Sequence, residues 1–297
     1  MPRIVSLISS ATEIVYALGA GEWLVGRSHE CDYPPEVLAL PVCSTPSFAV
    51  SGTSPEIDAQ VKDRLRNALS IYEVDDAQLR QLQPTHILTQ TQCEVCAVSL
   101  KDVERSVASQ LLTQPKIVSL QPNCLADVWE DIRAIAASLS IDPEPLIARL
   151  QSRMPRIEKA HRPTVACIEW LNPLMAAGNW VPELVELAGG HNLFGEAGKH
   201  SPWMTWLELQ QADPDIIIAM PCGFDQLRTR QEMHWLEEHS GYSDLSAVRN
   251  HQIHTVDGNA FFNRPGPRLV ESYEQLRSIF DLYTATHLHD HGHQKSH

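Results

Sequence analysis

The chain has 297 residues, of which 43% are hydrophobic and 20% charged, so it is long enough for two globular domains. Asp and Glu outnumber Lys and Arg by 37 to 23, which gives a net charge of −14 at pH 7. A negative field repels phosphate backbones and anionic membrane surfaces, so the composition argues against nucleic acid or a membrane surface as a partner. No apolar run reaches the ~20 residues of a membrane-spanning helix.

The start of the chain and its cysteines bear on the cellular compartment. Met1 and Pro2 lead directly into a strand-like segment, without a separate apolar signal region or a cleavage site. The seven cysteines are odd in number and scattered, which does not suggest a disulfide framework. We therefore expect a cytoplasmic protein, or a periplasmic one if a leader has been removed.

Short apolar strands alternate with helices in the first part of the chain. Strands are expected at 3–7, 24–28, 85–89 and 116–120, and helices at about 10–18, 55–69 and 75–82. Ser10 and Glu13 have the spacing of a capping box, which would begin the first helix. A helix-rich stretch follows from about 125 to 160, broken at 142–145, and Pro155 should kink or end its second half.

Strands return in the second part, at 164–168, 215–219 and 252–256. Helices are expected between and after them at about 182–188, 205–211, 225–238 and 267–283. Two echoes suggest a duplicated plan, because Pro2–Leu7 returns as Pro115–Leu120 and Leu79–Leu88 has a counterpart in Leu209–Ile218. Continuous apolar strands between helices suit parallel sheets that are covered on both faces.

We therefore predict an α/β protein with two Rossmann-like lobes. The expected divisions are an N-terminal lobe at 1–122, a linking helical segment at 123–162, a C-terminal lobe at 163–284 and a His-rich, disordered tail at 285–297. The alternating histidines of that tail could chelate a transition metal loosely.

Polar, aromatic and thiol side chains are concentrated just beyond the predicted strands. Ligands of open α/β sheets bind at the carboxyl ends of the strands, and aromatic walls with a few polar groups suit a sizeable amphipathic ligand. We predict a ligand in the cleft between the lobes, with contacts from Ser10, His29, Glu30, Cys31, Tyr33, Gln92, Glu169, Trp170, Trp180, Phe224, Asn259, Phe261, Phe262 and Arg264.

Several of these residues have a structural alternative. Arg264 could clamp a carboxylate, phosphate or amide oxygen of the ligand, or pair with a glutamate. His29 and Glu30 could coordinate a metal, including the cobalt of a corrinoid, or could anchor their loop through hydrogen bonds. The aromatic residues could belong to the core instead.

The thiols suggest a second kind of site. Cys93 and Cys96 have a spacing that can bind a metal or cycle as a dithiol, and Cys31 and Cys222 could join them from other strand ends. One pair falls short of the four ligands of structural zinc, so packing or ligand-lining thiols remain the alternative.

Enzymatic motifs are missing from the sequence. No Gly-x-Ser-x-Gly elbow, phosphate-cradling loop or dinucleotide-binding glycine motif follows the strands, so we do not expect an enzyme. A cysteine nucleophile at Cys31, Cys93 or Cys222 paired with His29 is the enzymatic alternative.

Five segments carry a resemblance to a known family: 3–13, 29–34, 93–97, 179–190 and 257–268. They resemble the cobalamin and iron-chelate substrate-binding protein family, and more narrowly its leaderless branch, usually labelled cobalamin-binding proteins. The resemblance implies a class III periplasmic-binding-protein fold, with two α/β lobes bridged by one long backbone helix. It also implies a soluble protein that holds cobalamin or a related corrinoid. A transition metal or metal chelate is the second expectation, and an ABC-importer partner stays open.

Overall fold

The computed structural model describes residues 1–47, 52–66, 71–91, 103–104 and 114–293. The chain divides into two contiguous units, Met1–Arg149 and Leu150–His297. Each unit contains its own largely parallel sheet with helices around it, so the predicted α/β class with parallel sheets is confirmed. No helix in the described ranges is long and apolar enough to cross a membrane.

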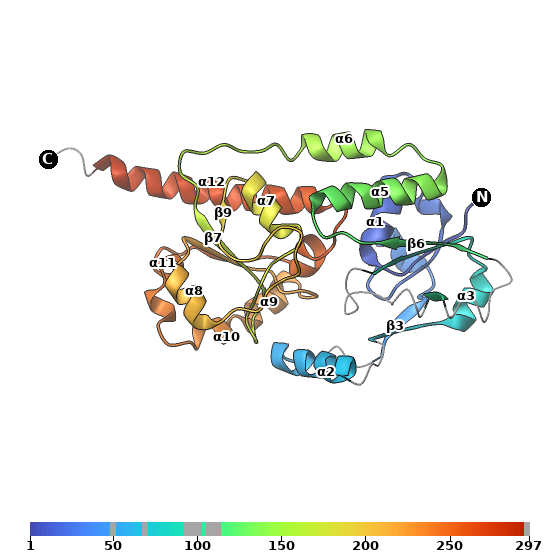
Figure 1. Cartoon of the computed structure of the whole chain (residues 1–297), viewed down its shortest axis with the longest axis horizontal. Helices are drawn as coiled ribbons and strands as arrows, with labels where there is room; N and C mark the ends of the chain where they lie inside the picture. Colours follow the sequence, from blue (N-terminus) through green and yellow to red (C-terminus); the bar gives the residue numbers. More distant parts are fainter. Residues whose placement is uncertain (48–51, 67–70, 92–102, 105–113, 294–297) are drawn as a thin grey trace. The chain divides into compact units, whose positions relative to one another are not determined.

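The first unit is built on a four-stranded parallel sheet in the order β2-β1-β5-β6 (Figure 1). Its strands are β1 (Ile4–Ser6), β2 (Leu24–Arg27), β5 (His86–Gln90) and β6 (Lys116–Leu120). Helices α1 (Ser9–Ala17) and α5 (Leu125–Leu139) contact each other, and each packs against the sheet. Helix α3 (Asp76–Leu82) contributes Leu79 to a cluster with Val5 and Ile87 of the sheet.

A short antiparallel strand pair lies outside this sheet. Strands β3 (Ser44–Pro46) and β4 (Tyr72–Val74) pair antiparallel, with Ser44 opposite Val74. This strand pair was not predicted, because each strand has only three residues and the two are far apart in the sequence. The remaining elements of this part are η1 (Gly21–Trp23), η2 (Pro35–Ala39) and α2 (Ser54–Arg66).

The second unit has a five-stranded sheet around β7 (Thr164–Trp170). Strands β10 (Ile216–Ala219), β11 (Ile253–Thr255) and β9 (His191–Asn192) run parallel within it, and β8 (Met175–Ala176) pairs antiparallel with β7. The helices are α7 (Val181–Leu187), α8 (Trp206–Ala212), α9 (Gln226–Glu232), α10 (His234–Glu237), η3 (Tyr242–Asp244), α11 (Ser246–Arg249) and α12 (Leu269–His293). The core includes Ile168, Leu209, Ile217 and Leu236, which places α8 and α10 against β7 and β10.

The helix-rich stretch at 125–160 contains two helices, and the break between them agrees with the one predicted at 142–145. Helix α5 ends at Ser140, whose φ of 60° is left-handed, and α6 (Glu144–Ser152) begins after Pro143. Helix α6 ends three residues before Pro155, as predicted. The division between the units lies inside α6, so it differs from the expected boundaries at 122 and 163. Helix α5 contacts α1 and β6 and belongs to the first unit.

Two further expectations differ from the structure. Helix α1 begins at Ser9, so Ser10 and Glu13 lie inside it and the predicted capping box is wrong. The echo at 115–120 does not mark a second lobe, because that segment is β6 of the first sheet. Helix α12 is described as far as His293, and the expected disorder of the tail from 285 stays a prediction.

Candidate ligand-binding surfaces at the strand ends

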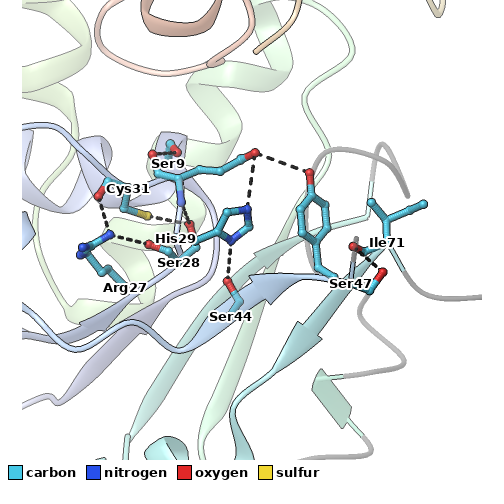
Figure 2. A network of polar contacts seen from close by, with 10 residues as sticks. Ser9, Arg27, Ser28, His29, Cys31, Ser44, Ser47 and Ile71 are labelled. Carbon is cyan, nitrogen blue, oxygen red and sulfur yellow. Dashed lines mark hydrogen bonds and ion pairs between the residues drawn. The ribbon is translucent and has the colours of Figure 1, made fainter. Parts of the chain in front are cut away.

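In the first unit, the loop after β2 and the β3–β4 strand pair bring together His29, Glu30, Ser44 and Tyr72, which we call the His29 cluster. Figure 2 shows His29 and Ser44 of this cluster. The Nδ1 atom of His29 lies 3.3 Å from Ser44 Oγ, and its Nε2 atom lies 3.8 Å from Glu30 Oε1. The Tyr72 hydroxyl donates to the same carboxylate oxygen at 3.5 Å. The imidazole and phenol rings are 5.1 Å apart, so the cluster combines an aromatic wall with a carboxylate.

The surroundings of His29 favour the neutral form of its imidazole. Burial lowers the pKa of its imidazole, the hydrogen bond with Ser44 opposes that effect, and the positive charge of Arg27 lowers the pKa further. The side chain keeps 23% of its surface exposed. A neutral, partly exposed imidazole can accept a hydrogen bond or bind a metal ion through the nitrogen that faces away from Ser44.

The loop that carries His29 is tied to the body of the unit. Ser9 Oγ donates to the carbonyl of Glu30 at 2.9 Å. Thr12 Oγ1 donates to Cys31 Sγ at 3.0 Å, and Ser28 Oγ lies 3.1 Å from the same sulfur. Cys31 is fully buried, so its thiol fixes the loop from the inside. Its predicted roles in ligand and metal binding would need the loop to open.

The other predicted residues of the first unit are scattered. Ser10 is 1% exposed within α1, and no hydrogen-bond partner for its hydroxyl occurs among the described residues. Tyr33 is 44% exposed. Gln92, Cys93 and Cys96 lie outside the described residues, so their predicted roles stay predictions. Across the described part of the chain, no three His, Cys, Asp or Glu side chains are grouped to hold a metal ion.

In the second unit, an aromatic pair marks the carboxyl ends of two neighbouring strands. Trp170 is the last residue of β7, and Phe224 lies in the turn after β10. Their rings are 5.2 Å apart and tilted by 49°, and the Arg228 guanidinium of α9 lies 4.3 Å from the centre of the phenyl ring. Trp170 Nε1 is buried and has no hydrogen-bond partner among the described residues. This indole therefore presents a donor that a ligand oxygen could satisfy.

Glu169 stands beside this pair and is oriented by a serine. Ser201 Oγ donates to Glu169 Oε2 at 2.8 Å and accepts the backbone N–H of Gly178 at 3.1 Å. The backbone N–H of Cys222, a half-buried residue, donates to the carbonyl of Glu169 at 3.1 Å. A Cβ atom on Gly178 would lie 2.6 Å from the carbonyl of residue 199, so glycine is needed for this close approach.

A π-helical turn, η4 (Gly258–Phe262), follows β11 and completes this surface. The backbone N–H of Asn259 donates to the carbonyl of Phe224 at 3.1 Å, which joins the turn to the aromatic pair. Trp180 Nε1 donates to the carbonyl of Phe262 at 3.0 Å, and both of these aromatic side chains are buried. They hold the turn in place, whereas Phe261 is half-buried beneath the guanidinium of Arg268, at 4.4 Å.

The structure therefore collects many of the predicted residues, but not all in the predicted manner. Arg264 is only 5% exposed, so its side chain is not open to solvent. Ser44, Tyr72, Ser201 and Arg228 were missed. Arg228 could have been found, because it lies one helical turn after Phe224; the other three reach the surfaces through tertiary contacts that leave no local pattern.

Comparisons with known proteins agree with this architecture. A family model described as periplasmic binding protein matches residues 4–260. The vitamin B12-binding protein of Vibrio cholerae is 26% identical over 285 residues, which cover 92% of this chain and 87% of that protein.

Solved structures show the same fold. The apo form of the periplasmic heme-binding protein RhuT from Roseiflexus sp. RS-1 has a TM-score of 0.68 at 21% identity, covering 95% of this chain and 98% of that one. The periplasmic vitamin B12 binding protein BtuF of Vibrio cholerae has a TM-score of 0.61 at 19% identity, with coverage of 95% and 98%.

The family that the sequence resembles is thus confirmed, and the expectation of a protein without enzymatic activity is confirmed with it. The chain belongs to the periplasmic binding protein family, and it is a substrate-binding protein that carries a small molecule.

Proposed function

We propose that the small molecule is a corrinoid such as cobalamin, and that the Trp170–Phe224 pair forms part of its binding surface. The proposal is supported by the similarity to the Vibrio cholerae vitamin B12-binding protein along 92% of this chain. It rests structurally on one observation, the buried indole N–H of Trp170 that has no partner among the described residues. A corrinoid offers a wide apolar face for the aromatic rings and peripheral amide oxygens for the N–H.

The surroundings of this indole suit a neutral ligand with amide groups. Glu169 lies one residue before the end of the same strand and is oriented by the Ser201 hydroxyl, so it can accept from an amide N–H. Trp170 can donate to an amide oxygen. Corrinoid rings carry several primary amides, so each of the two side chains can engage an amide of its own.

The first test is a titration of the purified full chain with cyanocobalamin, followed by calorimetry and by the visible spectrum of the corrin ring. We expect saturable binding with one ligand per chain and a dissociation constant of micromolar or below. Absence of binding at ligand concentrations of about 100 μM would overturn the proposal.

A pair of tryptophan variants tests the indole directly. Trp170→Phe keeps an aromatic ring but removes the N–H, and the loss of about 1 kcal/mol for one hydrogen bond predicts roughly fivefold weaker binding. Trp203→Phe is the matched control, because Trp203 is 54% exposed in the same unit. Equal affinities for the two variants would remove Trp170 from the binding surface.

Heme is the second candidate, and the His29 cluster is the observation that favours it. Its neutral imidazole could serve as an axial ligand to iron, with Tyr72 beside it. Titration with hemin would then shift the Soret band, and His29→Ala would abolish the shift while cyanocobalamin binding stayed unchanged. If the wild-type chain binds hemin more tightly than cyanocobalamin, the heme proposal replaces the corrinoid one.

The compartment is part of the proposal. The described cysteines at 31, 43, 124, 167 and 222 are thiols rather than disulfides, the form that a reducing cytoplasm maintains. We expect the protein in the cytoplasmic fraction of its native cells. Recovery from the periplasm would instead favour a role as a subunit of an ABC importer.

A further inference from the structure

A cavity of about 630 Å³ lies in the first unit, between the end of β6 and one face of α5. Its lining runs from Ser119 and Gln121 of the strand end to Ala134 and Ala137 of the helix. A volume of this size is within the range that small organic ligands occupy. None of the residues proposed above to contact the corrinoid or heme lines it, so the cavity does not depend on that proposal.

Asp131 is the central residue of the lining. Its side chain is more than nine-tenths buried, and one carboxylate oxygen accepts the backbone N–H of Gln121 at 3.3 Å. The other oxygen, Oδ2, is buried and has no hydrogen-bond partner among the described residues. Burial raises the pKa of this carboxyl to about 7; the hydrogen bond from Gln121 opposes the rise, and the charge of Asp127 adds to it.

The cationic side chain of the lining is already committed elsewhere. Arg133 donates through Nε to Glu144 Oε1 at 2.8 Å and through Nη1 to Glu130 Oε1 at 2.9 Å. Its Nη2 donates to the second oxygen of Glu144 at 3.4 Å. The guanidinium is therefore held by two other carboxylates, and among the described residues of the lining no other cation compensates the charge of Asp131.

The neutral side chains of the lining present acceptors. Gln121 Nε2 donates to Thr91 Oγ1 at 2.6 Å, and Ser119 Oγ donates to the same hydroxyl at 3.2 Å. Asn123 Nδ2 donates to the carbonyl of Gln121 at 3.1 Å. One N–H of each amide is used in these bonds, and no described residue donates to the amide oxygens of Gln121 and Asn123, which can therefore accept hydrogen bonds. The lining thus combines one buried carboxylate with an excess of acceptors.

We propose that this cavity binds a small organic cation, with the Asp131 carboxylate and the amide oxygens of Gln121 and Asn123 accepting hydrogen bonds from its ammonium group. An ammonium group would bring a positive charge next to the carboxylate and N–H donors for the amide oxygens. A divalent metal ion is a poorer match, because no group of three His, Cys, Asp or Glu ligands occurs in the described ranges.

The test uses the full chain at pH 8 and 1,4-diaminobutane as the probe, with 1,4-butanediol as its uncharged counterpart. Isothermal titration should show binding of the diamine and none of the diol. Asp131→Asn keeps the shape of the side chain, and we expect it to weaken diamine binding at least tenfold. Asp58→Asn is the charge-matched control, since Asp58 pairs with Lys62 elsewhere in the same unit, and it should leave the affinity unchanged.

A second measurement keeps the test decisive if the Asp131 variant does not fold. In ¹⁵N-labelled wild-type protein, the diamine should perturb the backbone amides of Gln121, Asn123 and their neighbours. Binding of equal strength to Asp131→Asn, perturbations confined to other regions, or no binding at millimolar diamine would each overturn the proposal. These outcomes are independent of whether cyanocobalamin binds.

Discussion

Several buried polar atoms at the strand ends have no hydrogen-bond partner among the described residues. Ser10 Oγ lies just beyond β1, Gln90 Oε1 is at the end of β5, and Trp170 Nε1 is at the end of β7. Folded proteins satisfy the large majority of such groups, because each unsatisfied one costs about 1–3 kcal/mol. Their position at the carboxyl ends of parallel strands is where α/β proteins bind ligands, so a ligand would offset the cost.

Asp131 leads to a prediction about stability and pH. In the folded chain the Asp131 carboxyl has a pKa of about 7, whereas in the unfolded chain its pKa is the ordinary 3.8. The folded state therefore binds more protons between these values, and wild-type stability should fall as the pH rises from about 4 to 7. Asp131→Asn removes this dependence and should be more stable than wild type at pH 8, by on the order of 2–4 kcal/mol.

Urea unfolding of both proteins at pH 5 and pH 8 would measure the difference. The advantage of Asp131→Asn should be clearly smaller at pH 5, where only part of the difference has developed, and nearly complete at pH 8. An equal advantage at both pH values would show that the carboxyl is not protonated in the folded chain at pH 5.

At single residues, the sequence located side chains that end a strand or directly follow one, and their role in ligand binding stays a prediction. His29 and Glu30 follow β2, and Glu169 and Trp170 end β7, so the rule that ligands bind at strand ends was enough to select them. Tyr72 of β4 also belongs to the His29 cluster, although it lies more than 40 residues further along the chain. Its role depends on a tertiary contact, which no local pattern encodes.

At the level of elements, two stretches with the same capping pattern behave differently. In α8, Thr205 and Glu208 bond each other's backbone N–H groups, and helix and pattern coincide. In α1, the Ser10–Glu13 pair has the same spacing but lies two residues too late, because the helix begins at Ser9 and its N-cap position is occupied by Ile8. The hydroxyl of Thr12 contacts the Cys31 thiol instead of capping a helix. Tertiary packing decided the start of α1.

The π-helical turn η4 was also beyond sequence reasoning. A five-residue turn has no hydrophobic period, and its glycine is required by a segment almost 40 residues away. A Cβ atom on Gly258 would lie 2.3 Å from the carbonyl oxygen of Pro221 and 2.4 Å from that of Met220. Such distances do not occur for real side chains, so the turn would have to move.

Gly258→Ala should therefore destabilise the second unit and displace Asn259 and Phe261. Overpacking of this kind costs about 1–3 kcal/mol, which thermal unfolding would detect. Gly198→Ala separates the effect of a clash from that of backbone strain: Gly198 has a φ of 77°, but no atom lies within 4 Å of its Cβ position. We expect a loss of only about 1 kcal/mol there. Equal losses in both variants would contradict the role assigned to the close approach.

For the whole molecule, the parallel α/β architecture could be predicted because the strands are continuous apolar runs separated by helices. The echo between Leu79–Leu88 and Leu209–Ile218 corresponds to a helix followed by a strand in each unit, α3–β5 and α8–β10. The boundaries were harder. Helix α5 was assigned to the linking segment because no strand pattern surrounds it. Its contacts with α1 and β6 place it in the first unit instead.

The division into contiguous units predicts separable folding. Fragments 1–149 and 150–297 should each show cooperative thermal unfolding and the circular dichroism of an α/β fold, because each contains its own sheet and core. The cut passes through α6 and removes only part of that short helix. A fragment that shows no cooperative transition would indicate that its stability depends on the other unit.

The strand order of the first unit also determines when its sheet can form during translation. Strand β1 pairs with β2 and with β5. The β1–β5 pairing joins residue 4 to residue 86, so about 80 residues must be synthesised before β1 can pair on its second side. No strand of that sheet has to wait for residues beyond 120. The first unit can therefore mature on the ribosome while the second is still being made, which shortens the time during which both exposed sheet edges are open to aggregation.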